Sequence, residues 1–341
     1  MEKVIIFGNT GFVGSWVTEY FLISNTKYKI FGYSLKPNTD PSIFKILKHS
    51  KRIESQIYAN ILNQKKLKEF ILKTKPDKII YLVSQPLVKD SLIKPEQTFL
   101  TNNFGLINLL EILRTNRLKN LSKLIIFTSD KVYKNVNLTK SLSENDALGG
   151  EDPYSASKAC QEIIAYSYFN SYFKKKISFV TLRAGNIIGG GDWSKYRIVP
   201  DIIKAKFNNK KLIIRNPLNV RPWQHVVDVC RAINLISKKK LSNKIIHNYN
   251  IGIFNNKNYP VKDILIFFEN YFGKIEKNYI KNSFQEKKYL SITSKKIYHN
   301  LNFKNLVNFK NANKLTCEWY DSFYKKLDMI KITINQINKY K

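Results

Sequence analysis

Cysteine and histidine are scarce in this sequence of 341 residues. Its three cysteines lie far apart with no CxxC pair, and its four histidines show no spacing typical of metal ligands. Disulfide bonds and zinc sites need paired or closely spaced side chains. We therefore predict neither a disulfide framework nor a metal site.

Long apolar runs are also missing. No stretch approaches the about 18 apolar residues that a membrane-spanning helix needs. The first residues form only a short apolar run before a glycine turn, unlike the longer run of a signal peptide. Apolar residues nevertheless make up 43% of the chain, enough for a large core. We expect a soluble, cytoplasmic protein with no membrane partner.

Acidic residues and arginines are few beside the lysines. The chain has 58 Lys and Arg against 25 Asp and Glu, a formal charge of +33. Only eight of the 58 are arginines, and the lysines are scattered through every segment. Proteins that read phosphates and bases favour the planar fork of arginine. The excess of Lys, Ile, Asn, Phe and Tyr matches AT-rich codons, so we expect no nucleic-acid partner.

Short β-rich runs alternate with helical patterns over the first half of the chain. The runs predicted as strands are Val4–Phe7, Lys29–Tyr33, Ile53–Tyr58, Lys78–Val83, Lys123–Thr128 and Ser178–Leu182. The segments predicted as helices are 15–24, 64–74, 95–117 and 153–174. This alternation predicts an α/β fold with a Rossmann-like, doubly wound parallel sheet.

The pattern of predicted strands and helices changes after about residue 180, where glycines and prolines separate shorter elements. We predict a dinucleotide-binding domain over 1–180, with part of 220–250 returning to it. A smaller C-terminal substrate-binding domain is expected over 181–330. The Asn- and Lys-rich segment 331–341 is expected to be a frayed tail.

A glycine-rich turn follows the first predicted strand and opens the first helix. It comprises Gly8, Asn9, Thr10, Gly11, Phe12, Val13 and Gly14. Glycines at this spacing allow a tight turn and the approach of a pyrophosphate to the helix N-terminus. A plain glycine loop is the alternative, but the position inside a βαβ pattern favours dinucleotide binding.

The acid that usually binds the adenosine ribose about 20 residues later is missing. Ser34 could bond one ribose hydroxyl, whereas Lys36 could bind a 2′-phosphate, so the sequence allows NAD or NADP. Asn60 and Ile61 follow the third strand, where an adenine would lie. Asn60 could pair with the adenine edge or simply end the strand in a turn.

Tyr154 and Lys158 lie four residues apart, one turn along a predicted helix. A nearby ammonium lowers the pKa of a tyrosine, which could then accept a hydroxyl proton during hydride transfer. Chance alone would give about three such pairs in this composition, and a second occurs at Tyr172. The helix-start signal Asp152-Pro153 distinguishes Tyr154, and we expect Tyr172 to pack or lie on the surface.

Ser129, Asp130 and Lys131 follow the fifth predicted strand, at the sheet edge where active sites lie. A dehydrogenase needs a hydroxyl such as that of Ser129 near the carbonyl. An added acid and amine suggest further proton transfers at neighbouring carbons. A polar turn is the alternative, but the position before the Tyr154 helix favours function.

These features together resemble the extended short-chain dehydrogenase/reductases, a family of NAD-dependent epimerases and dehydratases, over nearly the whole chain. Longer strings are most similar to CDP-glucose 4,6-dehydratases. They are 84–88 (SQPLV), 128–131 (TSDK), 149–155 (GGEDPYS), 183–193 (RAGNIIGGGDW), 214–217 (IRNP) and 220–225 (VRPWQH). The sequence departs from the pattern at Phe7, Lys36 and Asn60, all on the cofactor side.

The resemblance implies a reaction on a nucleotide sugar, with CDP-glucose as the expected substrate and NAD as cofactor. NAD would take hydride from C4 while Tyr154, helped by Lys158 and Ser129, takes the O4 proton. A base, for which Lys131 is the candidate, would remove the C5 proton. Asp130 would protonate the departing C6 hydroxyl, and hydride would return to C6.

The same resemblance implies substrate contacts from Gln85, Asn186, Trp193, Arg215 and Arg221. The arginines suit a diphosphate, whereas the alternatives are a packed aromatic ring and two solvated charges. His225 is expected to be structural. A 4-epimerase of the same fold is the nearest alternative function, and a nucleic-acid-binding protein is a remote one. Surplus apolar residues in 95–117 and 153–174 suggest a homodimer.

Overall fold

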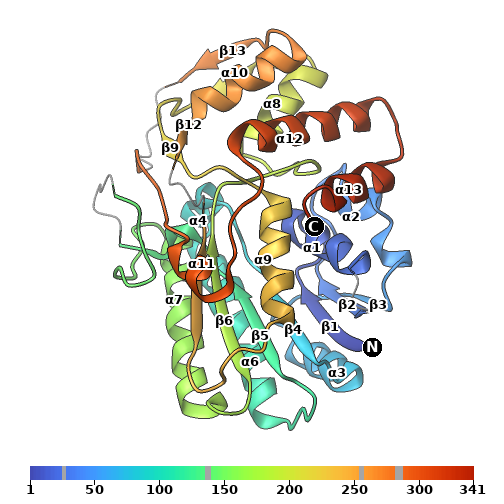
Figure 1. Cartoon of the computed structure of the whole chain (residues 1–341), viewed down its shortest axis with the longest axis vertical. Coiled ribbons are helices and arrows are strands. Elements are labelled where there is room, and N and C mark those ends of the chain that lie inside the picture. Colours follow the sequence, from blue (N-terminus) through green and yellow to red (C-terminus); the bar gives the residue numbers. More distant parts are fainter. Residues whose placement is uncertain (25–27, 135–139, 253–256, 281–286) are drawn as a thin grey trace.

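Seven parallel strands form the main sheet, in the order β11-β6-β5-β4-β1-β2-β3 (Figure 1). The computed structural model describes residues 1–24, 28–134, 140–252, 257–280 and 287–341. The strands are β1 (Glu2–Phe7), β2 (Tyr28–Ser34), β3 (Ser55–Tyr58), β4 (Lys78–Tyr81), β5 (Lys123–Phe127), β6 (Ser178–Ala184) and β11 (His247–Ile251). The predicted doubly wound α/β class is confirmed.

Helices cover both faces of the sheet because its central strands are apolar on both sides. In β1, Val4 and Ile6 join one core cluster and Ile5 and Phe7 join the other, as the two-residue period of a strand requires. One face carries α1 (Phe12–Leu22) and α9 (Val226–Lys238), and the opposite face carries α3 (Gln64–Thr74), α6 (Gly105–Thr115) and α7 (Pro153–Tyr168). No helix of the described residues is long and apolar enough to cross a membrane.

Two predicted long helices are interrupted by π-helical turns. Segment 95–117 divides into α5 (Pro95–Phe99), η2 (Leu100–Phe104) and α6, and α7 continues into η4 (Phe169–Phe173). The η2 turn points two amides at α7: Asn102 donates to the Ser157 hydroxyl over 2.8 Å and Asn103 donates to the Ser157 carbonyl over 2.8 Å. Such turns often lie near functional sites.

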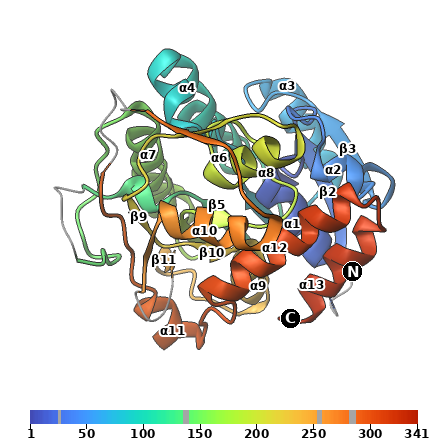
Figure 2. The same ribbon diagram turned by 90° about the horizontal axis from the view of Figure 1, so that it is seen from above.

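A smaller lobe lies beyond the carboxyl ends of the sheet strands (Figures 1 and 2). Its elements include α8 (Ile198–Phe207), β8 (Leu212–Ile214), β9 (Val220–Arg221), β12 (Tyr259–Pro260), α10 (Val261–Phe272), β13 (Lys277–Tyr279) and α12 (Phe309–Tyr324). The remaining elements are α2 (Ile43–Ile46), η1 (His49–Lys51), α4 (Val88–Ile93), η3 (Asp130–Val132), β7 (Ile187–Ile188), β10 (Gln224–His225), α11 (Lys295–Leu301) and α13 (Met329–Asn338).

Part of segment 220–250 belongs to the lobe that contains the main sheet. It supplies α9 and then β11, which pairs with β6 in parallel. The structure thus adds a strand and a crossover helix where the sequence pattern showed no further βαβ unit. Nine residues of this helix are buried, including Asp228.

The expectation of a frayed tail over 331–341 is wrong for most of that segment. Residues Met329–Asn338 form α13, and Ile337 is fully buried. The indole nitrogen of Trp319 donates to the Thr333 hydroxyl over 2.9 Å, and the Gln336 amide donates to the Leu315 carbonyl over 2.8 Å. Polar residues that suggested a solvated tail therefore serve as internal hydrogen-bond partners.

Candidate active site

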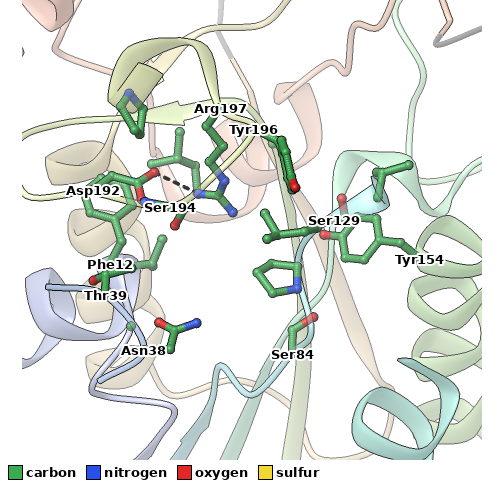
Figure 3. Close-up of a pocket in the computed structure, with 18 of the residues that line it drawn as sticks. Phe12, Asn38, Thr39, Ser84, Ser129, Tyr154, Asp192, Ser194, Tyr196 and Arg197 are labelled. Carbon is green, nitrogen blue, oxygen red and sulfur yellow. Dashed lines mark hydrogen bonds and ion pairs between the residues drawn. The ribbon is translucent and has the colours of Figure 1, made fainter. Parts of the chain in front are cut away.

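A cleft of about 1040 Å³ lies between the two lobes (Figure 3). Its lining includes the glycine turn, the carboxyl ends of β2 to β6, the start of α7, and residues of the smaller lobe around α8 and β8. This volume is at the upper end of ligand sites and leaves room for a dinucleotide beside a second ligand. The position at the carboxyl ends of the strands is the usual one for an open α/β sheet.

The glycine turn has the geometry of a pyrophosphate site. Gly8 has a φ of 80°, a conformation that favours glycine. A Cβ on Gly14 would lie 2.3 Å from the Gly8 carbonyl oxygen, so only glycine lets α1 begin this close to the turn. Gly11 is exposed, and its nearest neighbour would be 3.5 Å from a Cβ. An anion can thus approach the free amides at the start of α1.

The predicted cofactor residues gather on this side of the cleft, which Gly8, Thr10, Gly11, Phe12, Val13, Gly14, Ser34, Asn60 and Ile61 all line. The Thr10 hydroxyl lies 2.7 Å from that of Ser34 and donates to the Leu35 carbonyl over 2.9 Å. The Asn60 side chain accepts from the Leu62 amide over 3.0 Å. Asn60 therefore stabilises the turn after β3, which was one of its two expected roles. Its contact with adenine stays a prediction.

Lys36 lies at the same end of the cleft and is exposed. It makes no hydrogen bond or ion pair with any residue that the structure describes. Its ammonium is therefore available to a phosphate, which leaves the alternative of NADP open.

The start of α7 fixes the position of Tyr154. Asp152 caps the helix by accepting from the Ser155 amide over 3.0 Å, and Pro153 occupies the first helical position. The Tyr154 amide donates to the Ser91 hydroxyl of α4 over 3.1 Å. Figure 3 shows Ser129 and Tyr154 at one wall of the cleft, where the Ser129 hydroxyl acts to lower the pKa of the Tyr154 side chain.

Asp130 lies beside Ser129 and is almost fully buried, with 2% of its surface exposed. Its Oδ1 accepts from the Ser129 hydroxyl over 3.1 Å, and its Oδ2 has no partner among the described residues. Burial raises the pKa of Asp130 above its ordinary value, while the charge of Lys131 acts in the opposite direction. A buried carboxyl with a raised pKa can hold a proton and donate it.

Tyr154 and Lys158 both line the cleft, but the expected direction of the tyrosine's pKa shift is wrong for the chain alone. Burial raises the pKa of Tyr154 to about 12, although the nearby Ser129 hydroxyl acts in the opposite direction. Burial lowers the pKa of Lys158 to about 7, with the Glu162 charge opposing. A lysine whose pKa is lowered this far is only partly charged at neutral pH.

Hydrogen bonds hold the Lys158 ammonium toward the sheet. It donates to the Phe127 carbonyl over 3.2 Å and to the Gln161 side chain over 3.0 Å. The Gln161 amide in turn donates to the Asn102 carbonyl of η2 over 2.7 Å. Lys131 also lines the cleft, and its amide donates to the Ser129 hydroxyl over 3.2 Å.

Four of the five predicted substrate contacts line the cleft: Asn186, Trp193, Arg215 and Arg221. Gln85 is absent from the lining, because its side chain turns inward and donates to the Leu87 carbonyl and to the Thr98 hydroxyl, each over 3.1 Å. Trp193 is 4% exposed and packs edge-on against Trp319 at 5.6 Å. Most of the Trp193 surface is therefore buried against other residues, as the alternative of a packed aromatic ring expected.

Tyr172 and His225, for which no role in the site was predicted, are not among the residues that line the cleft. Tyr172 is 45% exposed and contacts Tyr168 on the surface, as expected. His225 is fully buried, and its Nδ1 accepts from the Val227 amide at the start of α9 over 3.3 Å. Burial lowers the pKa of His225 to about 3, so this side chain is a neutral helix cap.

The sequence argument missed several polar residues of the smaller lobe that line the cleft: Asp192, Tyr196, Arg197 and Asp201. Arg197 pairs with Asp192 over 3.0 Å (Figure 3). Tyr196 has a φ of 60°, and the Lys89 ammonium lies 4.4 Å from its ring centre. Only the string around Trp193 pointed to this region. No group of three or more potential metal ligands gathers within the described part of the chain.

Comparison with known proteins agrees with this geometry. The profile of the family described as GDP-mannose 4,6 dehydratase matches residues 5–316. A CDP-glucose 4,6-dehydratase of Salmonella typhimurium is 37% identical over 244 residues, covering 70% of this chain and 67% of that protein. The chain belongs to the GDP-mannose 4,6-dehydratase family. The family includes nucleotide-sugar 4,6-dehydratases and is of the extended short-chain dehydrogenase/reductase kind.

Other members of this dehydratase family and its structural neighbours are more distant. A dTDP-D-glucose 4,6-dehydratase of Dictyostelium discoideum is 30% identical over 74% of this chain, which spans 58% of that protein. The crystal structure of a Bacillus anthracis dTDP-glucose 4,6-dehydratase in complex with NAD superposes with a TM-score of 0.80 at 22% identity, covering 97% and 100% of the two chains. A Thermotoga maritima UDP-glucose 4-epimerase with UDP-glucose gives 0.82 at 18%, covering 94% and 99%. These structures share the fold.

Proposed function

We propose that this protein is an NAD-dependent dehydratase that converts CDP-glucose to CDP-4-keto-6-deoxyglucose. The observation that carries the proposal is the Asp130 carboxyl, which is 2% exposed and has an unpartnered oxygen. It accepts a hydrogen bond from Ser129, which lies at the same wall of the cleft as Tyr154. A proton donor for elimination thus lies next to the residues of an oxidation step.

The residues of the glycine turn fit NAD. The left-handed Gly8, the close approach at Gly14 and the open face of Gly11 match a pyrophosphate, as described above. Ser34 and Asn60 would lie near the ribose and the adenine. When bound, NAD supplies a hydride acceptor for C4 and returns the hydride to C6. NADP stays possible through Lys36.

The chain's own residues would move the protons. Tyr154 would take the proton of the sugar's O4 while Ser129 orients that oxygen. The C4 ketone acidifies the C5 proton, which a base removes, and Lys131 is the candidate because it lines the cleft beside Asp130. Asp130 would protonate the C6 hydroxyl, which leaves as water. When the hydride returns to C6, the protonated base gives its proton back to C5, so NAD is regenerated and the reaction consumes no cofactor.

CDP-glucose is preferred as the substrate because the Salmonella relative of that name is 37% identical, against 30% for the Dictyostelium dTDP-glucose enzyme. A 4-epimerase is the second candidate, favoured by the fold match to the Thermotoga enzyme. An epimerase needs the groups at Tyr154, Lys158 and Ser129 but no elimination acid. Asp130 therefore distinguishes the two functions.

The test is incubation of the purified protein with CDP-, dTDP-, UDP- and GDP-glucose, with and without added NAD or NADP. We expect a 4-keto-6-deoxy product from CDP-glucose, detected by mass spectrometry as loss of one water. Asp130→Asn should slow water loss by about 100-fold or more, because a general acid typically contributes that much. C4 oxidation should persist in this variant. A 4-epimer as the product, with Asp130→Asn fully active, would exclude the dehydratase.

We further propose a homodimer formed through α6, α7 and the π-turns beside them. Large apolar side chains are exposed there, where a monomer would favour polar ones. They are Leu100 (37% exposed), Phe104 (53%), Ile163 (56%), Tyr166 (60%) and Tyr172 (45%). Pairing of this face between two copies would remove these side chains from water.

A further inference from the structure

Three carboxylates line the cleft within the described residues, and two of them already have a proposed role or a partner. Asp130 is the proposed elimination acid. Asp192 pairs with Arg197 over 3.0 Å and accepts from the Ser194 amide over 3.0 Å. The third is Asp201 in the first turn of α8, whose carboxylate makes no hydrogen bond or ion pair to any residue placed in the structure.

The cations around Asp201 are engaged elsewhere. Arg197, four residues before it, is paired with Asp192. Lys204, three residues after it, donates to the Trp193 carbonyl over 2.7 Å. The Arg215 guanidinium lies 5.8 Å from the centre of the Tyr196 ring. Burial raises the pKa of Asp201 to about 6, so the carboxylate is mainly ionised at neutral pH and retains its full capacity to accept hydrogen bonds.

The fold orders these groups along the cleft, because Asp201 lies on α8, which packs against β8, and Arg215 directly follows β8. The charges that act on Asp130 are those of Lys131 and Arg221. Those that act on Asp201 are Lys204, Arg215 and Asp192. Arg221 thus belongs to the end where the sugar reacts, and Arg215 to the end formed by α8. A nucleotide sugar whose hexose reaches Asp130 and whose diphosphate lies by the two arginines would bring its nucleobase to Asp201.

A lone carboxylate near a bound diphosphate is electrostatically unfavourable unless it accepts hydrogen bonds from the ligand. Cytosine carries an amino group at C4, which a carboxylate accepts well, whereas uracil and thymine carry an oxygen there that repels it. We propose that Asp201 selects the cytosine base by accepting a hydrogen bond from its 4-amino group. This inference rests on the proposed function, whose nucleotide preference it explains.

Two other roles for Asp201 make different predictions. A carboxylate in the first turn stabilises its helix through the dipole, which would affect stability and not the choice of base. A bond to a ribose hydroxyl would strengthen the binding of every ribonucleotide equally. The preference between CDP and UDP therefore isolates base recognition, because these nucleotides differ only in the base.

The experiment is calorimetric titration of the NAD-loaded full-length protein with CDP and with UDP. We expect wild type to bind CDP at least about 10-fold more tightly than UDP, the discrimination of one good base contact. Asp201→Asn should reduce this ratio to below about 3-fold, because its amide can also donate to the 4-oxygen of uracil. Asp201→Leu should weaken CDP binding far more than UDP binding. Asp263→Asn, in the first turn of α10, is the matched control for the dipole and should keep the wild-type ratio.

Acidification supplies a second readout. As the pH falls through the pKa of Asp201, the wild-type preference for CDP should decline, while the ratio of Asp201→Asn stays flat. Equal losses for CDP and UDP in Asp201→Asn, or no preference in wild type, would overturn the inference.

The two proposals can fail separately, because nucleotide binding requires no chemistry. A normal CDP preference that depends on Asp201, without dehydration of CDP-glucose, would reject only the dehydratase. Dehydration of CDP-glucose with an unchanged preference in Asp201→Asn would reject only the role of Asp201.

Discussion

The carboxyl group of Asp130 packs directly against the backbone of Gly185, at the end of β6. A Cβ atom at position 185 would lie 1.9 Å from the Asp130 Cγ. Gly185 therefore provides the space in which the buried carboxyl sits. Its carbonyl also accepts a hydrogen bond from the Gln224 amide over 3.0 Å, which ties β6 to β10 at this point.

Gly185→Ala should displace Asp130 and slow elimination at least about 100-fold, as expected when a general acid loses its position. The added methyl should also lower stability by about 1–3 kcal/mol, the usual effect of overpacking a core. Turnover and urea unfolding measure the two effects. In an Asp130→Asn background, Gly185→Ala should slow elimination no further, because both changes act through one group. Additive losses would contradict this coupling.

The local part of this fold could be predicted from the sequence. The helix expected over 64–74 is α3 with the same bounds, and the six predicted strands all lie in the main sheet. Periodicity and glycine or proline signals determine such elements within short windows. The sequence likewise predicted that the glycine turn and Ser129 lie at the carboxyl edge of the sheet, because both follow parallel strands, which all end there.

Long-range packing accounts for what the sequence did not reveal. Trp193 was expected at the ligand, yet its partners Trp319 and Phe323 come from α12, far along the chain. Asp201 drew no attention because an acid in a first helical turn is ordinary. Its lack of a partner becomes visible only when Lys204 and Arg197 are seen bonded elsewhere.

Glu162, on α7, is the centre of a buried polar network between that helix and the sheet. It accepts from Thr128 over 2.6 Å, from Thr181 over 2.7 Å and from both the Nε and one terminal nitrogen of Arg183. Glu162→Gln would leave the buried guanidinium without its counter-charge. We expect a loss of about 3–5 kcal/mol in the free energy of unfolding.

Urea unfolding measures this loss. The matched control is Glu318→Gln, which removes an exposed carboxylate 3.8 Å from Lys314 and should change stability by less than about 0.5 kcal/mol. A similarly small change for Glu162→Gln would mean that the network contributes little to stability.

Ile163→Lys should weaken the proposed dimer, because it places a charge in the middle of the exposed apolar face of α7. Light scattering coupled to size-exclusion chromatography would report the mass. We expect wild type to elute as a dimer and the variant to shift toward the monomer at micromolar concentration. Ile266→Lys is the control, since Ile266 is 51% exposed on α10 of the smaller lobe and should leave the dimer intact. A monomeric wild type would reject the dimer.

Lys158 should make the stability of the protein depend on pH in a defined direction. Its folded pKa is lowered to about 7, whereas an unfolded lysine titrates near 10.4. Between these values the unfolded chain binds more protons at this position, so rising pH stabilises the fold. Below about pH 7 both states bind the proton, and burial of the charged form destabilises the fold.

Lys158→Met removes this dependence together with the ammonium group that the proposed mechanism uses. The free energy of unfolding of wild type relative to the variant should rise by about 1 kcal/mol per pH unit from pH 7 to 10. Other titrating groups cancel in this difference. The variant should be inactive with CDP-glucose. As the pH falls, its free energy of unfolding should increase relative to that of wild type. Urea unfolding at successive pH values measures the slope. If the difference in free energy of unfolding between wild type and variant does not vary with pH, Lys158 keeps an ordinary pKa in the fold. The conclusion that this lysine is partly neutral at pH 7 would then be wrong.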